Sequence, residues 1–284
     1  MTDDKWCLSL EVRLADEPAK HLTTLWPSLR TLLATLDDDP AHLFVTSPKG
    51  RTGRDRVFSW KTMEKLGADE NTGTISAWEL RHHQVSFDLS VYLRHNAALE
   101  THEQPPARIA MAVEFVPNVY APPGLVDAAV AFLGQCAEHM PVLHGGITRL
   151  ENRAQAAIET TGGGTDRAAQ PDQFQRRSDF EWWMNNREIW TRCRRLYWTT
   201  LLGPDLTVAL GGAEAARGAG AVDVHEINGS LLLRAMEGPP RDSLDPEFLA
   251  ATTSLRRWLW PHTFQNPLDA AGFELEVGLP PPEL

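Results

Sequence analysis

The amino-acid sequence predicts an α+β protein with mostly antiparallel sheets and with helices packed on one face. Three observations lead to this prediction. Several segments alternate apolar and polar residues, which is typical of strands with one buried face. Other segments repeat apolar residues at steps of three and four, which predicts amphipathic helices. Strand-like segments also follow one another without an intervening helix, which favours antiparallel pairing.

Composition limits the classes of protein to consider. Apolar residues at 42% and charged residues at 23% exclude a disordered chain, and 284 residues suffice for one large domain or two ordinary ones. The 38 acidic and 27 basic residues give a net charge of −11. This charge argues against binding to nucleic acid or to an anionic membrane and favours a partner with a basic surface.

The cysteines and the N-terminus predict a soluble cytoplasmic protein. Cys7, Cys136 and Cys193 lie far apart within apolar patterns, as buried reduced thiols do. The first residues lack the basic and apolar regions of a signal peptide, and no apolar run is long enough to cross a membrane.

Residues 1–150 read as an N-terminal α+β half. Residues 8–14 alternate as a strand, and residues 16–36 form a helix that Pro27 should kink or divide and that ends at the carboxylates Asp37, Asp38 and Asp39. The pattern continues with strands over residues 42–47, 75–80, 85–94, 108–116 and 142–148 and with helices over residues 60–66 and 125–139. The basic segment between residues 48 and 56 reads as a loop.

Residues 151–178 contain three successive glycines and read as a linker or long excursion, followed by a C-terminal α+β half over residues 179–284. Apolar spacing over residues 186–201 predicts a tryptophan-rich helix that Gly203 and Pro204 should end, and a short second helix begins at Asp205. Asn228-Gly229 predicts a hairpin between residues 222–227 and 230–236. A last helix includes residues 255–259, and residues 273–277 could form a final strand. The two halves could be related α+β units.

No recognised pattern of residues predicts catalysis, a cofactor or a metal ion. Adjacent His82 and His83 would point to opposite faces of a strand, and the zinc spacings H-E-x-x-H and C-x-x-C are absent. The G-x-S-x-G and G-x-G-x-x-G motifs are absent as well. We therefore expect no enzyme. His144 and the basic 48–56 segment are the residues that a cleft for an anionic small molecule would use.

Candidate partner contacts are instead acidic or aromatic. They are Asp37, Asp38 and Asp39 at the helix end, Asp69 and Glu70 in a turn, and Trp198, which falls on the arginine side of the predicted helix. Solvated carboxylates and packing of Trp198 within the protein are the simpler interpretations of the same residues.

One segment resembles a known family. Trp198, Leu202 and Gly203 followed by Leu-Gly-Gly at residues 210–212 are similar to the type VI secretion immunity-protein family, as are the N-terminal alternation, the acidic helix and the HGGI segment at residues 144–147. The resemblance implies a cytoplasmic immunity protein that binds a cognate toxin and blocks its active site. In related systems the toxin is often a nuclease, whose active-site region is usually basic.

Three functional hypotheses remain. The first is an immunity protein that neutralises a toxin with a basic active-site surface. The second is a cytosolic enzyme that acts on an anionic small molecule, and the third is a structural component of a secretion apparatus. A toxin gene beside this gene would favour the first hypothesis.

Overall fold

The computed structural model describes residues 6–47, 53–81, 86–94, 107–115, 124–150, 191–193, 195–241 and 245–263. Within these residues, ten strands form one sheet in the order β3-β2-β4-β5-β6-β1-β7-β8-β10-β9, and each neighbouring pair is antiparallel. The strands are β1 (Trp6–Leu14), β2 (Pro40–Thr46), β3 (Gly53–Val57), β4 (Thr74–Leu80), β5 (Ser86–Tyr92), β6 (Ala107–Phe115), β7 (Val142–Leu150), β8 (Thr199–Leu202), β9 (Asp223–Ile227) and β10 (Ser230–Arg234). The predicted α+β class is thus confirmed.

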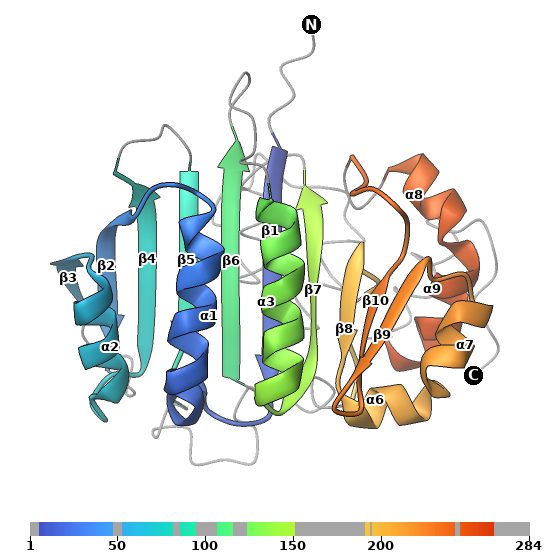
Figure 1. Ribbon diagram of the computed structural model, residues 1–284, viewed down its shortest axis with the longest axis horizontal. Coiled ribbons are helices and arrows are strands. Elements are labelled where there is room, and N and C mark those ends of the chain that lie inside the picture. The colour runs from blue at the N-terminus through green and yellow to red at the C-terminus, as the bar shows by residue number, and fades with distance from the viewer. Residues whose placement is uncertain are drawn as a thin grey trace, which may run out of the picture.

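The helices are η1 (Pro18–His21), α1 (Leu22–Ala34), α2 (Trp60–Ala68), α3 (Leu125–His139), α6 (Pro204–Ala209), α7 (Gly212–Gly218), α8 (Pro246–Ala251), α9 (Thr253–Leu259) and η4 (Trp260–His262). Figure 1 shows α1, α2 and α3 side by side on the same face of the sheet. The predicted helix over residues 16–36 corresponds to η1 and α1, and Pro27 lies within α1 without dividing it.

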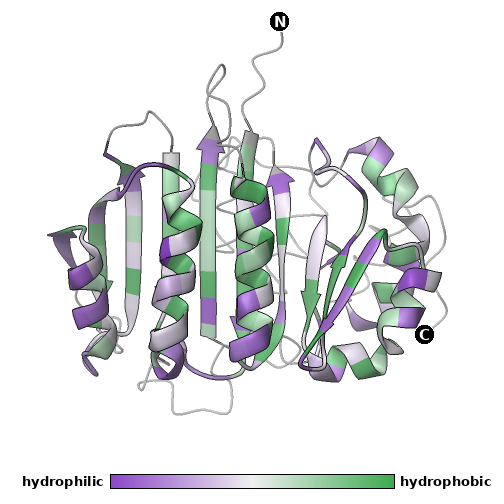
Figure 2. Ribbon diagram, in the orientation of Figure 1, coloured by the Kyte–Doolittle hydropathy of each residue, from purple (hydrophilic) through white to green (hydrophobic). Residues whose placement is uncertain are grey.

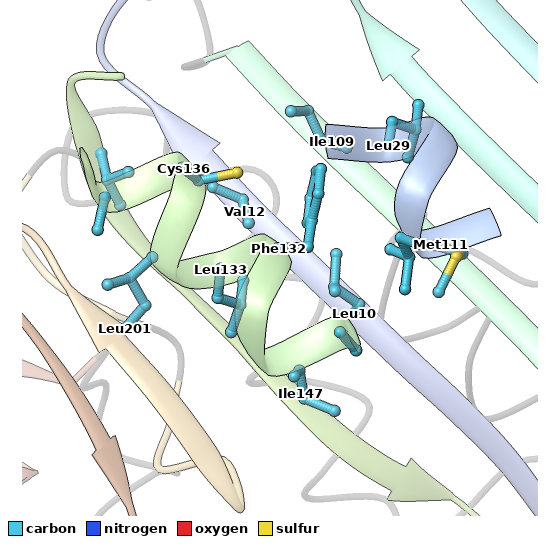
Figure 3. Close-up of a cluster of buried hydrophobic side chains, with 14 of the residues drawn as sticks. Leu10, Val12, Leu29, Ile109, Met111, Phe132, Leu133, Cys136, Ile147 and Leu201 are labelled. Atoms are coloured by element: carbon cyan, nitrogen blue, oxygen red, sulfur yellow. The ribbon is translucent and has the colours of Figure 1, made fainter. Parts of the chain in front are cut away.

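Apolar residues at every second position of the central strands form the core beneath these helices. Leu8, Leu10, Val12 and Leu14 of β1 are buried and belong to the main hydrophobic cluster. Figure 3 shows Phe132 and Leu133 of α3 packed over the apolar side chains of β1 and its neighbours. Because successive strand residues point to opposite faces, the remaining side chains of β1 lie on the other face of the sheet.

Hydropathy differs between the middle and the margin of the sheet. Figure 2 shows a largely apolar central stretch in β6 and a hydrophilic β3 at the edge. All five residues of β3 are exposed, and the basic 48–56 segment, predicted as a loop, is a strand from Gly53 onward. Residues 48–52 lie outside the described part of the chain.

The predicted helix over residues 186–201 is wrong in the part that the structure describes. Residues 191–193 and 195–198 are not helical, and Thr199–Leu202 is strand β8. Gly203 and Pro204 do not end a helix, because Gly203 is the N-cap of α6 and Pro204 its first residue. Proline is favoured there since the first helical N–H needs no partner within the helix. Trp182, Trp183 and Trp190 lie outside the described residues.

The hairpin prediction is confirmed. β9 and β10 pair through Asn228 and Gly229, whose φ angles of 48° and 79° are both positive. Positive φ at both central residues suits the right-handed twist of the flanking strands. The last predicted helix corresponds to α8 and α9, and the predicted strand over residues 273–277 lies outside the described residues.

The predicted boundary at residue 150 falls between adjacent strands of one sheet. β7 ends at Leu150 and pairs with β8, the first described strand of the second half. One cluster of buried apolar side chains contains Leu10 of β1 as well as Leu233 of β10. Residues 151–178, predicted as a linker or excursion, lie outside the described residues.

Candidate functional site

The face of the sheet opposite α1, α2 and α3, here called the rear face, carries most of the polar side chains of the central strands. On β1 these are Ser9, Glu11 and Arg13, which alternate with the buried leucines and valine. Antiparallel register places Arg13 opposite Arg108 of β6 and opposite His144 of β7. The rear face therefore brings charged groups together from three neighbouring strands.

A buried ionic cluster, here called the Glu11 cluster, consists of Glu11, Arg13, Arg108 and Tyr92. The Glu11 carboxylate lies 2.7 Å from Arg13 Nη2 and 4.0 Å from Arg108 Nη1. Arg108 Nη2 donates a hydrogen bond of 3.2 Å to the Tyr92 hydroxyl, and its guanidinium lies 4.8 Å from the Tyr92 ring centre. All three charged side chains are no more than 8% exposed.

Burial governs the electrostatics of this cluster. It lowers the pKa of the Arg13 guanidinium to about 10, and the neighbouring Glu11 carboxylate opposes the shift. A buried guanidinium is costly unless a carboxylate lies close to it. The Glu11 carboxylate thus offsets part of the cost of burying the two guanidiniums.

His144, the histidine that the sequence suggested for an anionic cleft, lies at the margin of this cluster. It is 3% exposed and lies across from Arg13. The ring of Tyr197 covers the nearby Gly146, since a Cβ at Gly146 would lie 2.4 Å from Tyr197 Cδ2. His144 therefore lies between Arg13 of β1 and Leu202 of β8, two residues from the glycine that Tyr197 covers.

A second group on the rear face is aromatic and partly accessible. We call His42, Phe44, Trp78 and Val57 the stack patch. The rings of His42 and Trp78 stack with centroids 5.5 Å apart and planes 17° apart, and Phe44 meets Trp78 edge-on at 6.3 Å. Val57 of β3 pairs with His42 and is 77% exposed. The stack patch therefore presents apolar and π surface to solvent.

Gly53 makes room for one side chain of the stack patch. A Cβ on Gly53 would lie 1.7 Å from Phe44 Cζ, so the Phe44 ring lies directly on the Gly53 backbone. Any larger residue at position 53 would displace this ring.

The predicted acidic contacts Asp37, Asp38 and Asp39 lie at one end of the stack patch. Asp39 O accepts a hydrogen bond from Arg81 N, and the adjacent Pro40 pairs with Leu80 at the end of β4. Asp37 and Asp39 are exposed, whereas Asp38 is half-buried. Glu79, which the sequence did not single out, lies at the same end, with a carboxylate oxygen 3.5 Å from His42 Nε2.

The other predicted acidic pair, Asp69 and Glu70, lies at the opposite end of β2 and β4. This turn follows α2 and leads to Gly73, whose N–H donates to Thr46 O at the far end of β2. Seven strand residues separate the two ends, about 20 Å along the strand. Hydrogen bonds from the backbone and side-chain amides of Asn71 lower the pKa of Asp69. The structure therefore does not bring the two acidic groups together.

Trp198 is not a surface contact. It is 2% exposed, and its indole Nε1 donates a hydrogen bond of 3.0 Å to Met236 O. The sequence-based placement on an exposed side failed because it assumed a helix where the chain is extended. The simpler interpretation, packing within the protein, is the one that the structure supports.

The Glu11 cluster and the stack patch escaped the sequence reasoning. Charged residues that alternate with apolar ones in a strand usually indicate a solvated face. The sequence pattern therefore does not show that Glu11 and Arg13 are buried. His42 and Phe44 lie two residues apart on β2, and Trp78 lies on β4. Only the pairing of these two strands brings the three side chains together.

Within the described residues, no group of three or more histidine, cysteine, aspartate or glutamate side chains could hold a metal ion. Cys7, Cys136 and Cys193 are buried and form no disulfide with one another, and burial raises the pKa of Cys193 to about 12. In the described part of the chain, no helix is both long and apolar enough to span a membrane.

Comparison with known proteins identifies a similar fold. The Pseudomonas aeruginosa T6SS protein PA0821 superposes with a TM-score of 0.62 at 12% sequence identity, covering 92% of this chain and 77% of that one. No family model matches the sequence. No curated protein matches it either. The similarity therefore extends across most of both chains and concerns their fold.

Proposed function

We propose that this chain is an immunity protein that binds a cognate antibacterial toxin and occludes its active site. The fold similarity to a T6SS protein over 92% of the chain is the observation that carries the proposal. The sequence resemblance to the type VI secretion immunity family supports the same function. In this proposal the protein acts in the cytoplasm as a stoichiometric inhibitor and catalyses no reaction.

The charge of the chain favours a particular class of toxin. A net charge of −11 complements a surface that attracts phosphate, and long-range attraction between opposite charges accelerates association. Nucleases need such a basic surface to hold their substrate. We therefore propose a nuclease effector delivered by type VI secretion as the partner.

Co-expression with the protein encoded beside this gene tests the proposal. We expect a 1:1 complex in size-exclusion chromatography with light scattering, and loss of the neighbour's activity on DNA or RNA when this chain is added. A neighbour that is active on nucleic acid and remains equally active with an excess of this chain would contradict the proposal.

The Glu11 cluster supports one alternative, an enzyme that acts on an anionic small molecule. Arg108 is 3% exposed, and its Nε has no hydrogen-bond acceptor among the residues that the structure describes. A carboxylate or phosphate on the rear face would supply one. Thermal unfolding with phosphate and with small dicarboxylates tests this alternative, and a midpoint that rises saturably for wild type and not for Arg108→Met would favour it.

A further inference from the structure

The stack patch combines features that binding surfaces share. The His42 side chain is 51% exposed, and Val57 beside it is 77% exposed. Trp78 and Phe44 are half-buried, so each is held in place by the protein while part of its ring remains accessible. Partly exposed aromatic side chains supported from beneath are typical anchors of protein interfaces.

Carboxylates lie at one end of this apolar centre and along its β3 edge. Asp37, Asp39 and Glu79 lie at one end of it, and Asp55 of β3 lies beside Phe44. All four residues are exposed. We call these four residues the acidic rim.

The charges of the edge strand divide between the two faces of the sheet. Asp55 pairs with Phe44 and Val57 pairs with His42, so both residues belong to the rear face. Arg54 pairs with Val45 and Arg56 pairs with Leu43, which places both arginines on the opposite face. The rear face of β3 therefore contributes a carboxylate and an apolar side chain, and its positive charges lie on the other side.

Two members of the acidic rim have unusual backbone angles. Asp37 and Glu79 have φ values of 52° and 57°. For residues other than glycine, such angles cost about 1 kcal/mol each. Strict alternation would place Leu80 on the same face as Trp78, yet Leu80 is 7% exposed and belongs to the main core. Within β4, the positive φ of Glu79 thus accompanies a buried Leu80 and a Glu79 carboxylate beside His42.

We propose that the stack patch and the acidic rim form the docking surface for a basic protein partner. An arginine or lysine side chain of the partner stacks on the accessible parts of the His42 and Trp78 rings and forms ion pairs with Glu79 and Asp39. Aromatic rings attract a cation through their negative faces, and the nearby carboxylates strengthen this attraction. The inference rests on the proposed function, because it names the surface that the toxin contacts.

Two matched pairs of variants test this surface. Val57→Arg and Val208→Arg change valines that are 77% and 81% exposed, one in the stack patch and the other on α6 in the second half of the chain. Glu79→Lys and Glu226→Lys reverse exposed carboxylates on β4 and on β9, the edge strand at the other end of the sheet. The probe is the purified protein encoded beside this gene, and its Kd is measured by biolayer interferometry at two salt concentrations.

We expect Val57→Arg and Glu79→Lys each to weaken binding on the order of tenfold or more, as the loss of an interface anchor does. Val208→Arg and Glu226→Lys should bind within about twofold of wild type. Equal affinities for all four variants, or equal losses in both members of a pair, would overturn the assignment of the surface while leaving the immunity function intact. A wild-type chain that does not bind the neighbour contradicts the proposed function itself.

A second measurement tests the surface without that neighbour. The chain is labelled with ¹⁵N and titrated with the peptide hexaarginine at physiological salt. Saturable shift changes centred on Val57, His42 and the Trp78 indole, lost in Glu79→Lys and retained in Glu226→Lys, would support the docking surface. Shift changes spread evenly over all exposed carboxylates would overturn it.

Discussion

Glu11 is the residue on which the buried charges of the rear face depend. Its carboxylate lies within ion-pair distance of both Arg13 and Arg108. Replacing one partner of a buried ionic group leaves the remaining charges without compensation, which costs more free energy than the intact group contributes.

Glu11→Gln should therefore lower the free energy of unfolding by about 3 kcal/mol, because both guanidiniums lose their carboxylate. Urea unfolding at pH 7 measures the change. Glu226→Gln on β9 is the matched control, since Glu226 is exposed and should shift stability by less than about 0.5 kcal/mol. Equal midpoints for the two variants would show that the Glu11 cluster contributes little to stability.

Trp198 gives a second prediction at this scale. Trp198→Phe keeps an aromatic ring and removes the donor to Met236 O, so unfolding should require about 1–2 kcal/mol less free energy. Affinity for the partner, measured under conditions where the variant is fully folded, should stay within twofold of wild type because Trp198 is buried. A large loss of affinity in a fully folded variant would contradict this placement.

At the scale of single elements, the sequence predicted those whose two faces differ. The spacing of the leucines in α1 and the alternation in β1, β5 and β6 indicate elements with one apolar and one polar side. The structure confirms this helix and these strands. β8 is different, because all four of its residues are buried. A segment that is buried on both faces has no period that separates helix from strand. Leu196, Tyr197, Thr200 and Leu201 then matched helical spacing by chance.

The N-cap of α8 predicts a pH-dependent stability. The Asp245 carboxylate accepts hydrogen bonds from the backbone N–H groups of Arg241 and Glu247, which lowers its pKa below the ordinary value of 3.8. A carboxylate whose pKa is lowered on folding stabilises the protein fully above the unfolded pKa, and the contribution is lost as pH falls through the folded pKa.

Asp245→Ala should consequently cost about 1 kcal/mol of stability at pH 7, the usual cost of losing a cap. The difference from wild type should shrink as pH falls below about 3.8. Urea unfolding of both proteins between pH 7 and pH 3 provides the measurement. A difference that stays constant over this range would show that hydrogen bonding to the ionised carboxylate is not its cause.

At the scale of the whole molecule, the two predicted halves share one sheet, and Gly203 lies where they join. Gly203 N donates to Leu143 O, and a Cβ at Gly203 would lie 2.1 Å from Val142 O. The backbone of the second half thus approaches the strand β7 of the first half more closely than any side chain would allow.

Gly203→Ala should destabilise the protein by about 3 kcal/mol, since the added methyl group must push two backbone segments apart. Gly218→Ala is the control, because a Cβ at that end of α7 would meet no atom within 4 Å. We expect the control to be neutral or slightly stabilising.

Native-state hydrogen exchange distinguishes a shared fold from two independent units. If the sheet unfolds cooperatively, Gly203→Ala lowers the protection of β1 and of β10 amides by the same free energy. Loss of protection confined to β8, β9 and β10 would show that the halves unfold separately.

The sequence could not predict the arrangement of the candidate site, because that arrangement depends on long-range pairing. Nothing in the sequence distinguishes the acidic residues Asp37 and Asp39 from Asp69 and Glu70. Only the first pair lies beside the stack patch. The pairing of β2 with β4 decides this, and no local pattern specifies which strands become neighbours.

The alternating charges of β3 also affect how two copies of the chain could associate. An exposed edge strand can recruit a second copy and extend the sheet. Consider β3 of one copy paired antiparallel with β3 of another, with the helices of both copies on the same side of the joined sheet. Central registers of this pairing place Asp55 opposite Asp55 of the other copy, Arg54 opposite Arg54, or Arg56 opposite Arg56. Like charges directly opposite one another disfavour pairing. Arg54, Asp55 and Arg56 thus disfavour the pairing of two copies through this edge.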